Sequence, residues 1–240
     1  MAAEVVEGLA ECIMDAAGVA PDPPVSLKAI AAYLGVSSIR EVDMVEDGRL
    51  EQLAGQRRIY IRTGTAPSRR RFTIAHEFGH IVLAGREAEF IAHRSAATAD
   101  PEERFCNQFA AALLMPRRWL LKTVSPHYES LDVAQAVSRA TGASLAATVV
   151  RLRDVLGWRS SLLQWRTLNG TWRLSTTVGL PRHAHNHINT TPETRAMLDA
   201  TRGCRQKDIT VPVAVAGKPS AVRGELFVQQ RTAVVLGRVG

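Results

Sequence analysis

The sequence predicts an α+β fold, in which a helical core with a small β-sheet is followed by a helix-turn-helix-like pair and a strand-rich C-terminal module. Helical periodicity and short β-rich runs alternate in the first half of the chain. Two helical stretches then flank Gly142, as in a helix-turn-helix. After Gly157 the composition changes to short strands bounded by turn residues. We therefore expect domains at residues 1–130, 131–158 and 159–240.

The individual elements follow from apolar spacing and from residues that start or stop helices. The expected helices are 2–17, 27–34, 69–83, 101–115, 131–140, 144–156 and about 192–201. Short strands are expected within 40–62 and at 162–168, 171–177, 209–216 and 225–236. A polar loop is expected at 86–100, and a solvated loop is favoured over a metal site for His183, His185 and His187.

The composition is typical of a globular protein that can bury a core, with 240 residues, 46% hydrophobic and 22% charged. A net charge of +7 permits contact with nucleic acid, but solvated arginines give the same number. Three widely spaced cysteines argue against a disulfide framework and suit a reducing cytoplasm. An acidic N-terminal stretch and the lack of a run of about 18 apolar residues predict neither a signal peptide nor a membrane span.

Residues 72–83 (FTIAHEFGHIVL) contain the motif H-E-x-x-H. On a helix, His76 and His80 lie on one face a turn apart, where two imidazoles can bind one tetrahedral zinc ion. Glu77 lies about 100° around the helix from His76, so it borders the metal as a base for zinc-bound water. The same helix carries an apolar stripe, so the three polar side chains need partners once buried, which argues against a chance pair of surface histidines.

A third ligand is expected from the helix at 101–115, which offers Glu102 and Glu103. Glu103 shares its face with Asn107, whose amide oxygen can accept the free ring N–H of a ligand histidine. Glu102 aligns instead with Cys106, so Glu103 is the preferred ligand. The alternative is that both glutamates only favour the positive end of the helix dipole.

Two segments, RRRFTIAHEFGHIVL and EERFCNQFAAALLMP, make the chain resemble the ImmA/IrrE family of metallopeptidases. The resemblance extends through PPVSLKAIAAYLG and SLAATVVRLRDVLGW, and so covers about residues 1–158. Phe105 departs from the pattern, because many relatives carry a second acidic residue there. By position, the resemblance implies a Zn²⁺ ion on His76, His80 and Glu103, with Glu77 catalytic. It also implies an endopeptidase that cleaves a repressor-type protein to control gene expression.

Two rival interpretations stay open. In the first, the protein keeps the zinc fold but acts by binding a repressor or DNA without catalysis. In the second, the helices at 131–156 read DNA. Residues 144–150 offer almost no basic or amide side chains, and Arg151 and Arg153 come late, so direct nucleic-acid binding is not favoured.

An arginine-rich stretch precedes the motif. It could steer an acidic substrate, but a solvated surface around a strand is favoured. The strand through Ile59, Tyr60 and Ile61 could form a cleft edge that pairs with an extended substrate. The arginines of this stretch are Arg57, Arg58, Arg62, Arg69, Arg70 and Arg71.

Overall fold

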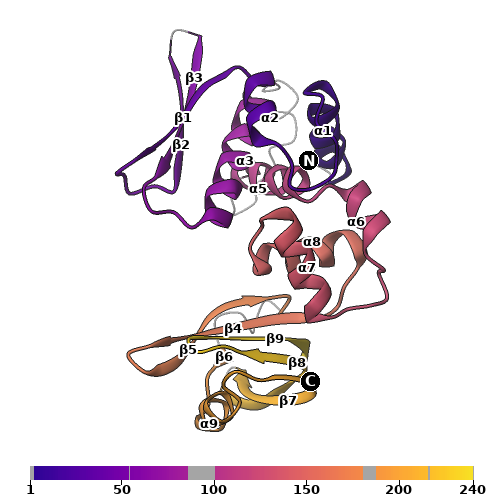
Figure 1. The fold of residues 1–240 in the computed structure, drawn as a ribbon, viewed down its shortest axis with the longest axis vertical. Helices are drawn as coiled ribbons and strands as arrows, with labels where there is room; N and C mark the ends of the chain where they lie inside the picture. Colours follow the sequence, from indigo (N-terminus) through magenta and orange to yellow (C-terminus); the bar gives the residue numbers. More distant parts are fainter. Residues whose placement is uncertain (1–2, 54, 86–100, 181–187, 216, 240) are drawn as a thin grey trace. The chain divides into compact units, whose positions relative to one another are not determined.

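The computed structural model describes residues 3–53, 55–85, 101–180, 188–215 and 217–239 (Figure 1). The predicted loop at 86–100 and the histidines His183, His185 and His187 lie outside the described residues. The predicted α+β class is confirmed, with helices and two β-sheets. In the part of the chain that is described, no helix is both long and apolar enough to cross a membrane.

The chain divides into two compact units, one of residues 1–123 with 137–144 and one of 124–136 with 145–240. Helix α7 (Leu131–Thr141) is shared between the units, and α8 (Leu145–Leu156) belongs to the second. The division into three domains at 130 and 158 stays a prediction.

The first unit combines helices with a three-stranded sheet. Ser26 caps α2 by accepting a hydrogen bond from the N–H of Ala29 at 3.4 Å. Pro67 lies in the first turn of α3, and Gly85 follows its last residue. The elements are α1 (Ala3–Ala16), α2 (Leu27–Tyr33), β1 (Val36–Val42), β2 (Gly48–Leu53), β3 (Gln56–Arg62), α3 (Pro67–Ala84), α5 (Pro101–Leu114) and α6 (Arg117–Thr123).

The three-stranded sheet has the order β1-β3-β2, with β3 parallel to β1 and antiparallel to β2. Because β3 hydrogen-bonds on both sides, its backbone has no free edge for a peptide. Ile59 and Ile61 are also completely buried. The substrate-pairing role predicted for Ile59, Tyr60 and Ile61 therefore does not fit this sheet, and the edge strand that approaches α3 is β2.

Helices α3 and α5 pack closely because a glycine lies at their contact. A Cβ built on Gly79 would come within 2.9 Å of the Cα of Cys106. Real Cβ atoms do not approach so closely, so any larger residue would push the helices apart. Phe78 of α3 and Phe109 of α5 are fully buried. The sequence thus fixes the distance between the two helices on which the predicted site residues lie.

The second unit contains a six-stranded sheet of order β5-β4-β9-β8-β7-β6, with a core around Trp165 and Trp172. The single strand predicted at 225–236 is wrong, because the chain turns back at 229–231 and forms two antiparallel strands. No glycine, proline, asparagine or aspartate marks this turn. The elements are β4 (Ser161–Leu168), β5 (Thr171–Val178), β6 (Ile188–Asn189), α9 (Pro192–Ala200), β7 (Arg205–Val215), β8 (Lys218–Val228) and β9 (Thr232–Val239).

Partly buried acids in the second unit accept hydrogen bonds from nearby donors. Glu129 accepts hydrogen bonds from the N–H groups of Arg159 and Ser160 and from the Ser160 hydroxyl, at 3.0, 2.8 and 2.6 Å. Burial acts to raise the pKa of Glu129, but these hydrogen bonds outweigh it and the pKa is lowered. Glu225 likewise accepts from the N–H of Leu131 at 2.8 Å. These carboxylates hold segments of the second unit together.

Candidate metal centre

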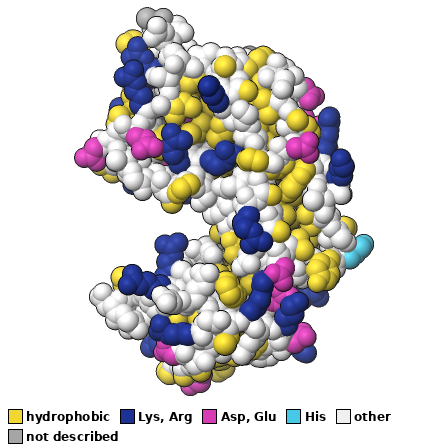
Figure 2. Space-filling view, in the orientation of Figure 1, with side chains coloured by type: hydrophobic (Ala, Val, Ile, Leu, Met, Phe, Trp, Pro, Cys, Tyr) yellow, Lys and Arg dark blue, Asp and Glu magenta, His cyan; other side chains and the backbone are white. Residues whose placement is uncertain are grey.

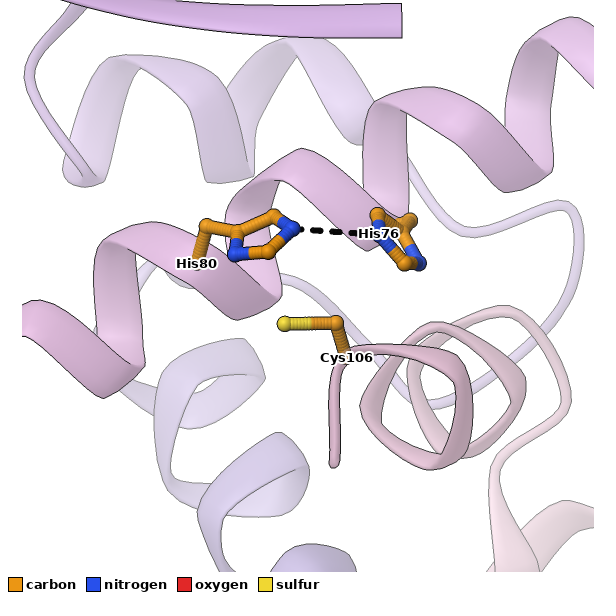
Figure 3. A group of neighbouring side chains, drawn as sticks. All are labelled: His76, His80 and Cys106. Atoms are coloured by element: carbon orange, nitrogen blue, oxygen red, sulfur yellow. Dashed lines mark hydrogen bonds between the residues drawn. The ribbon is translucent and has the colours of Figure 1, made fainter. Parts of the chain in front are cut away.

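Two imidazoles from α3 meet at the centre of the candidate site (Figure 3). The Nε2 atoms of His76 and His80 are 3.1 Å apart, as expected for residues one helical turn apart. Their side chains are 15% and 22% exposed, so both rings are largely screened from water. The structure therefore brings together the two histidines that the motif predicts.

Glu103 of α5 completes a triangle with the two rings. Its carboxylate oxygens lie 3.4 Å from Nε2 of His76 and 3.5 Å from Nε2 of His80. Tetrahedral zinc ligands at 2.0–2.1 Å from the metal are separated from one another by about 3.3 Å. The three observed separations of 3.1, 3.4 and 3.5 Å match this spacing. Two imidazoles and one carboxylate also form a donor set that suits a divalent metal ion, so these residues fit such an ion.

The other ring nitrogens are held by α5. Nδ1 of His76 is 3.1 Å from Oδ1 of Asn107, and Nδ1 of His80 is 3.1 Å from Oε1 of Glu102. When both Nδ1 atoms donate to these oxygens, both Nε2 lone pairs are free for a metal. The contact of Asn107 is the one that the sequence suggested. The contact of Glu102 was missed, because assigning it to a different helix face ignored how far its side chain reaches.

The pKa of His76 favours metal binding, because it keeps the ring neutral. Burial lowers the pKa of His76, although the charge of Glu103 and the hydrogen bond that the ring donates to Asn107 oppose this effect. A lowered pKa keeps the ring neutral around pH 7, and the neutral ring is the form that binds metal.

Cys106 is a further potential ligand that sequence reasoning assigned no role. Its Sγ and one nitrogen of each histidine lie within 4.8 Å of one another. Figure 3 shows the three side chains as neighbours. The thiol is completely buried, and its Sγ would lie only 3.2 Å from a Cβ on Gly79. The sulfur is thus packed against the backbone of α3. Glu103 reaches the Nε2 atoms directly and is the better candidate for the third ligand.

Glu77 lies beside this cluster and is 6% exposed. Burial raises its pKa above the usual range, although the N–H of Leu50 hydrogen-bonds to it and acts in the opposite direction. Strand β2 passes so close that a Cβ on Gly48 would lie 2.8 Å from Oε1 of Glu77. The edge strand therefore orients a carboxylate whose raised pKa suits it to accept a proton.

The two histidines, Glu77, Glu103 and Asn107 line one cavity of about 420 Å³ in the first unit. One part of the wall is the metal-ligand cluster, and another is formed by the start of β2 and the first turns of α3. The lining residues are Asp47, Gly48, Arg69, Phe72, Thr73, His76, Glu77, His80, Glu103 and Asn107.

Most arginines near the motif stabilise the fold. Figure 2 shows Lys and Arg side chains over the three-stranded sheet, with acidic side chains among them. Arg57 and Arg71 donate to the backbone carbonyls of Leu34 and Val25 at 2.7 and 3.0 Å. The remaining four have carboxylate partners: Arg58 with Glu51, Arg62 and Arg69 with Asp47, and Arg70 with Glu41. Only Arg69 of the six lines the cavity.

The basic residues of α8, the second helix of the helix-turn-helix-like pair, take part in the packing of the fold. Arg151 is 5% exposed, and Arg153 donates to the carbonyl of Ser160 at 2.6 Å. Neither guanidinium is presented as a DNA reader requires.

The fold and the site together define a class. An H-E-x-x-H helix, packed against a helix that supplies a carboxylate, is the arrangement of a metallopeptidase. The IrrE N-terminal-like domain of the peptidase M78 family matches residues 31–153, and the chain belongs to this family.

Comparison with solved structures shows a similar fold and nothing more. A solved structure titled Mycobacterium tuberculosis transcriptional regulator matches 98% of this chain and 75% of its own, with a TM-score of 0.57 and 14% identity. None of the curated proteins compared matches the sequence.

Proposed function

We propose that the protein is a zinc-dependent endopeptidase that cleaves a regulatory protein of the repressor type. One observation carries the proposal: the two Nε2 atoms and the Glu103 carboxylate are spaced like ligands of one tetrahedral zinc ion, with Glu77 buried beside them. A zinc ion bound there supplies a Lewis acid that polarises the scissile carbonyl and lowers the pKa of water. The regulatory substrate is inferred from the family.

Each protein residue has a defined task in this proposal. His76, His80 and Glu103 hold the metal, while Asn107 and Glu102 fix the orientation of the two rings. Glu77 takes a proton from the attacking water and delivers it to the nitrogen of the leaving amine. Burial raises the pKa of this carboxylate, which makes it a stronger base.

The edge of β2 that faces away from β3 is the proposed binding site for the substrate backbone. In the pairing with β3, Leu50 lies opposite Ile59, and its N–H bonds to Glu77 instead of to β3. Neighbours two residues along a strand face the same way, so Gly48 and Gln52 also direct their backbone groups away from β3. An extended peptide that adds to this edge passes beside Glu77.

Glu77→Gln provides the test of catalysis. The amide cannot accept the proton, so we expect cleavage to fall by about 100-fold or more while zinc content stays at one ion per chain. Zinc is measured by mass spectrometry of the metal and cleavage with purified candidate substrates. Glu41→Gln, in an exposed glutamate paired with Arg70, is the matched control and should change neither.

The same variant can identify the substrate. Glu77→Gln protein is used to capture partners, and each captured protein is then incubated with zinc-loaded parent protein. Cleavage by the parent, but not by the variant, would identify a substrate. Full biological function in Glu77→Gln cells would instead favour a protein that acts only by binding.

A further inference from the structure

Arg69 lies on the same strip of α3 as the metal-ligand histidines. Residues 69, 73, 76 and 80 follow the three- and four-residue spacing that puts side chains on one helix face. Arg69 is seven residues before His76, or about 10 Å along the helix axis. Phe72 lies between them and also lines the cavity, with its ring centroid 6.4 Å from that of His76. One wall of the cavity is thus apolar next to the metal-ligand cluster and basic further out.

The guanidinium of Arg69 is held in place but not saturated. Its Nε donates to Oδ2 of Asp47 at 2.9 Å, and its Nη2 donates to the same oxygen. Among the described residues, these bonds use two of the five N–H groups of Arg69 and leave three. The side chain is 59% exposed, whereas Asp47 is 28% exposed. The ion pair therefore fixes the direction of the guanidinium and leaves its outer side accessible.

The local charge is not balanced by Asp47. The same carboxylate also pairs with Arg62. Asp47, Arg62 and Arg69 together therefore carry a net charge of +1, from two positive charges and one negative charge. Among the described lining residues, Arg69 is the only arginine or lysine. A further carboxylate would neutralise this positive charge and accept hydrogen bonds from the remaining N–H groups of Arg69.

We propose that Arg69 binds a substrate carboxylate two or three residues from the scissile bond, so that the enzyme prefers an acidic residue there and an apolar one between. The inference rests on the proposed peptidase function. An extended peptide advances about 3.3 Å per residue, so three residues span the distance from the metal-ligand cluster to Arg69. Phe72 contacts the intervening apolar side chain. The carboxylate is supplied by an internal Asp or Glu, or by the C-terminus of the substrate.

The test compares two arginines that are adjacent in the same helix. Arg69→Glu reverses the charge in the cavity, and Arg69→Gln removes it with less repulsion of Asp47. Arg70→Glu reverses a charge that is paired with Glu41 and does not line the cavity, so it is the matched control. The zinc-loaded proteins are given a randomised library of amidated dodecapeptides, and the products are sequenced by mass spectrometry.

We expect the parent and Arg70→Glu proteins to enrich Asp and Glu two or three residues from the cut. Arg69→Gln should lose this preference by about tenfold, the scale of a charge-assisted hydrogen bond, and Arg69→Glu should favour Lys or Arg. A merely structural role of Arg69 would lower all cleavage without reversing the preference. An unchanged preference in both Arg69 variants would overturn the inference and leave the peptidase function standing. A zinc-loaded parent that cuts no peptide would overturn the proposed function, and this inference with it.

Two further measurements complete the test. A second library with free C-termini distinguishes the sources of the carboxylate, because cuts close to the end would then dominate if the C-terminus is bound. Binding of the best amidated peptide to Glu77→Gln protein, measured by fluorescence anisotropy, should weaken about tenfold when Arg69→Gln is added. Equal binding with and without Arg69→Gln would count against a contact with the substrate.

Discussion

Glu129 of the second unit, which is partly buried, and Glu77 of the first unit, which is buried, have opposite pKa shifts. In the second unit, Glu129 accepts three hydrogen bonds from protein donors, and its pKa is lowered. In the first unit, Glu77 is more deeply buried, and its pKa is raised by that burial. Glu129 thus gains stability from its ionised form, whereas Glu77 retains a charged form that folding disfavours.

This difference is the one expected between a structural acid and the proton acceptor proposed for Glu77. A carboxylate that is fully hydrogen-bonded has little capacity left to accept a proton. One that is buried with few donors is a stronger base and lowers the stability of the fold. The following substitutions, in order of decreasing effect, test the metal centre of the first unit and the structural acid of the second.

Glu103→Ala should have the largest effect on the metal centre. It removes one of three predicted ligands, so we expect metal affinity to fall by about 100-fold or more, with cleavage lost in parallel. Its side chain is 53% exposed, so the metal-free protein should keep its melting temperature. Zinc competition titration and thermal unfolding provide the two measurements. Unchanged zinc affinity would mean that Cys106 or Glu102 serves instead.

Asn107→Ala should weaken the metal centre less. The substitution removes the acceptor 3.1 Å from Nδ1 of His76, but leaves all three predicted ligands. Loss of such an orienting contact costs about 10- to 100-fold in metal affinity or activity. The same zinc titration measures it, and Gln108→Ala, at the exposed neighbouring position, is the control. A loss as large as that of Glu103→Ala would contradict a purely orienting role.

Glu129→Ala should affect stability and leave the metal centre unchanged. It leaves two backbone N–H groups and a hydroxyl without their acceptor, at a cost of about 1–3 kcal/mol. Chemical denaturation of the zinc-free protein measures this cost. Zinc affinity should equal that of the parent, because the substitution lies in the second unit.

The pH dependence of stability should have opposite signs at the two acids. The lowered pKa of Glu129 means that its stabilisation is present above about 4.5, its ordinary pKa, and is lost as the pH falls through its folded value. The raised pKa of Glu77 means that its charge destabilises the metal-free fold above about the same pH. At pH 7, Glu129→Gln should therefore lower the melting temperature of metal-free protein and Glu77→Gln should raise it slightly. Both differences should shrink below pH 4, and equal signs at pH 7 would refute the comparison.

Local patterns predicted the parts of the site that lie on single helices. The spacing of His76 and His80, and the shared face of Glu103 and Asn107, depend only on helix geometry. The contribution of β2 could not be predicted in this way. It depends on sheet order, which places Gly48 and Leu50 against Glu77 although 29 and 27 residues separate them in the sequence.

The error at Ile59–Ile61 has the same origin. An alternating β-rich segment identifies a strand, but being central or at an edge is a property of its neighbours. The missed contact between Glu102 and His80 reflects side-chain reach across two packed helices, and Gly79 sets the separation of those helices.

The interleaved course of the chain has a practical consequence for dissecting the protein. Residues 137–144 return to the first unit after an excursion into the second, and Gly142 lies against Arg71, five residues before His76. A Cβ on Gly142, whose φ is +67°, would lie 3.0 Å from Cδ of Arg71. A fragment that stops at residue 130 would lack residues 137–144, and Arg71 would lose its contact with Gly142. A minimal fragment that carries the candidate metal centre should therefore reach at least residue 144.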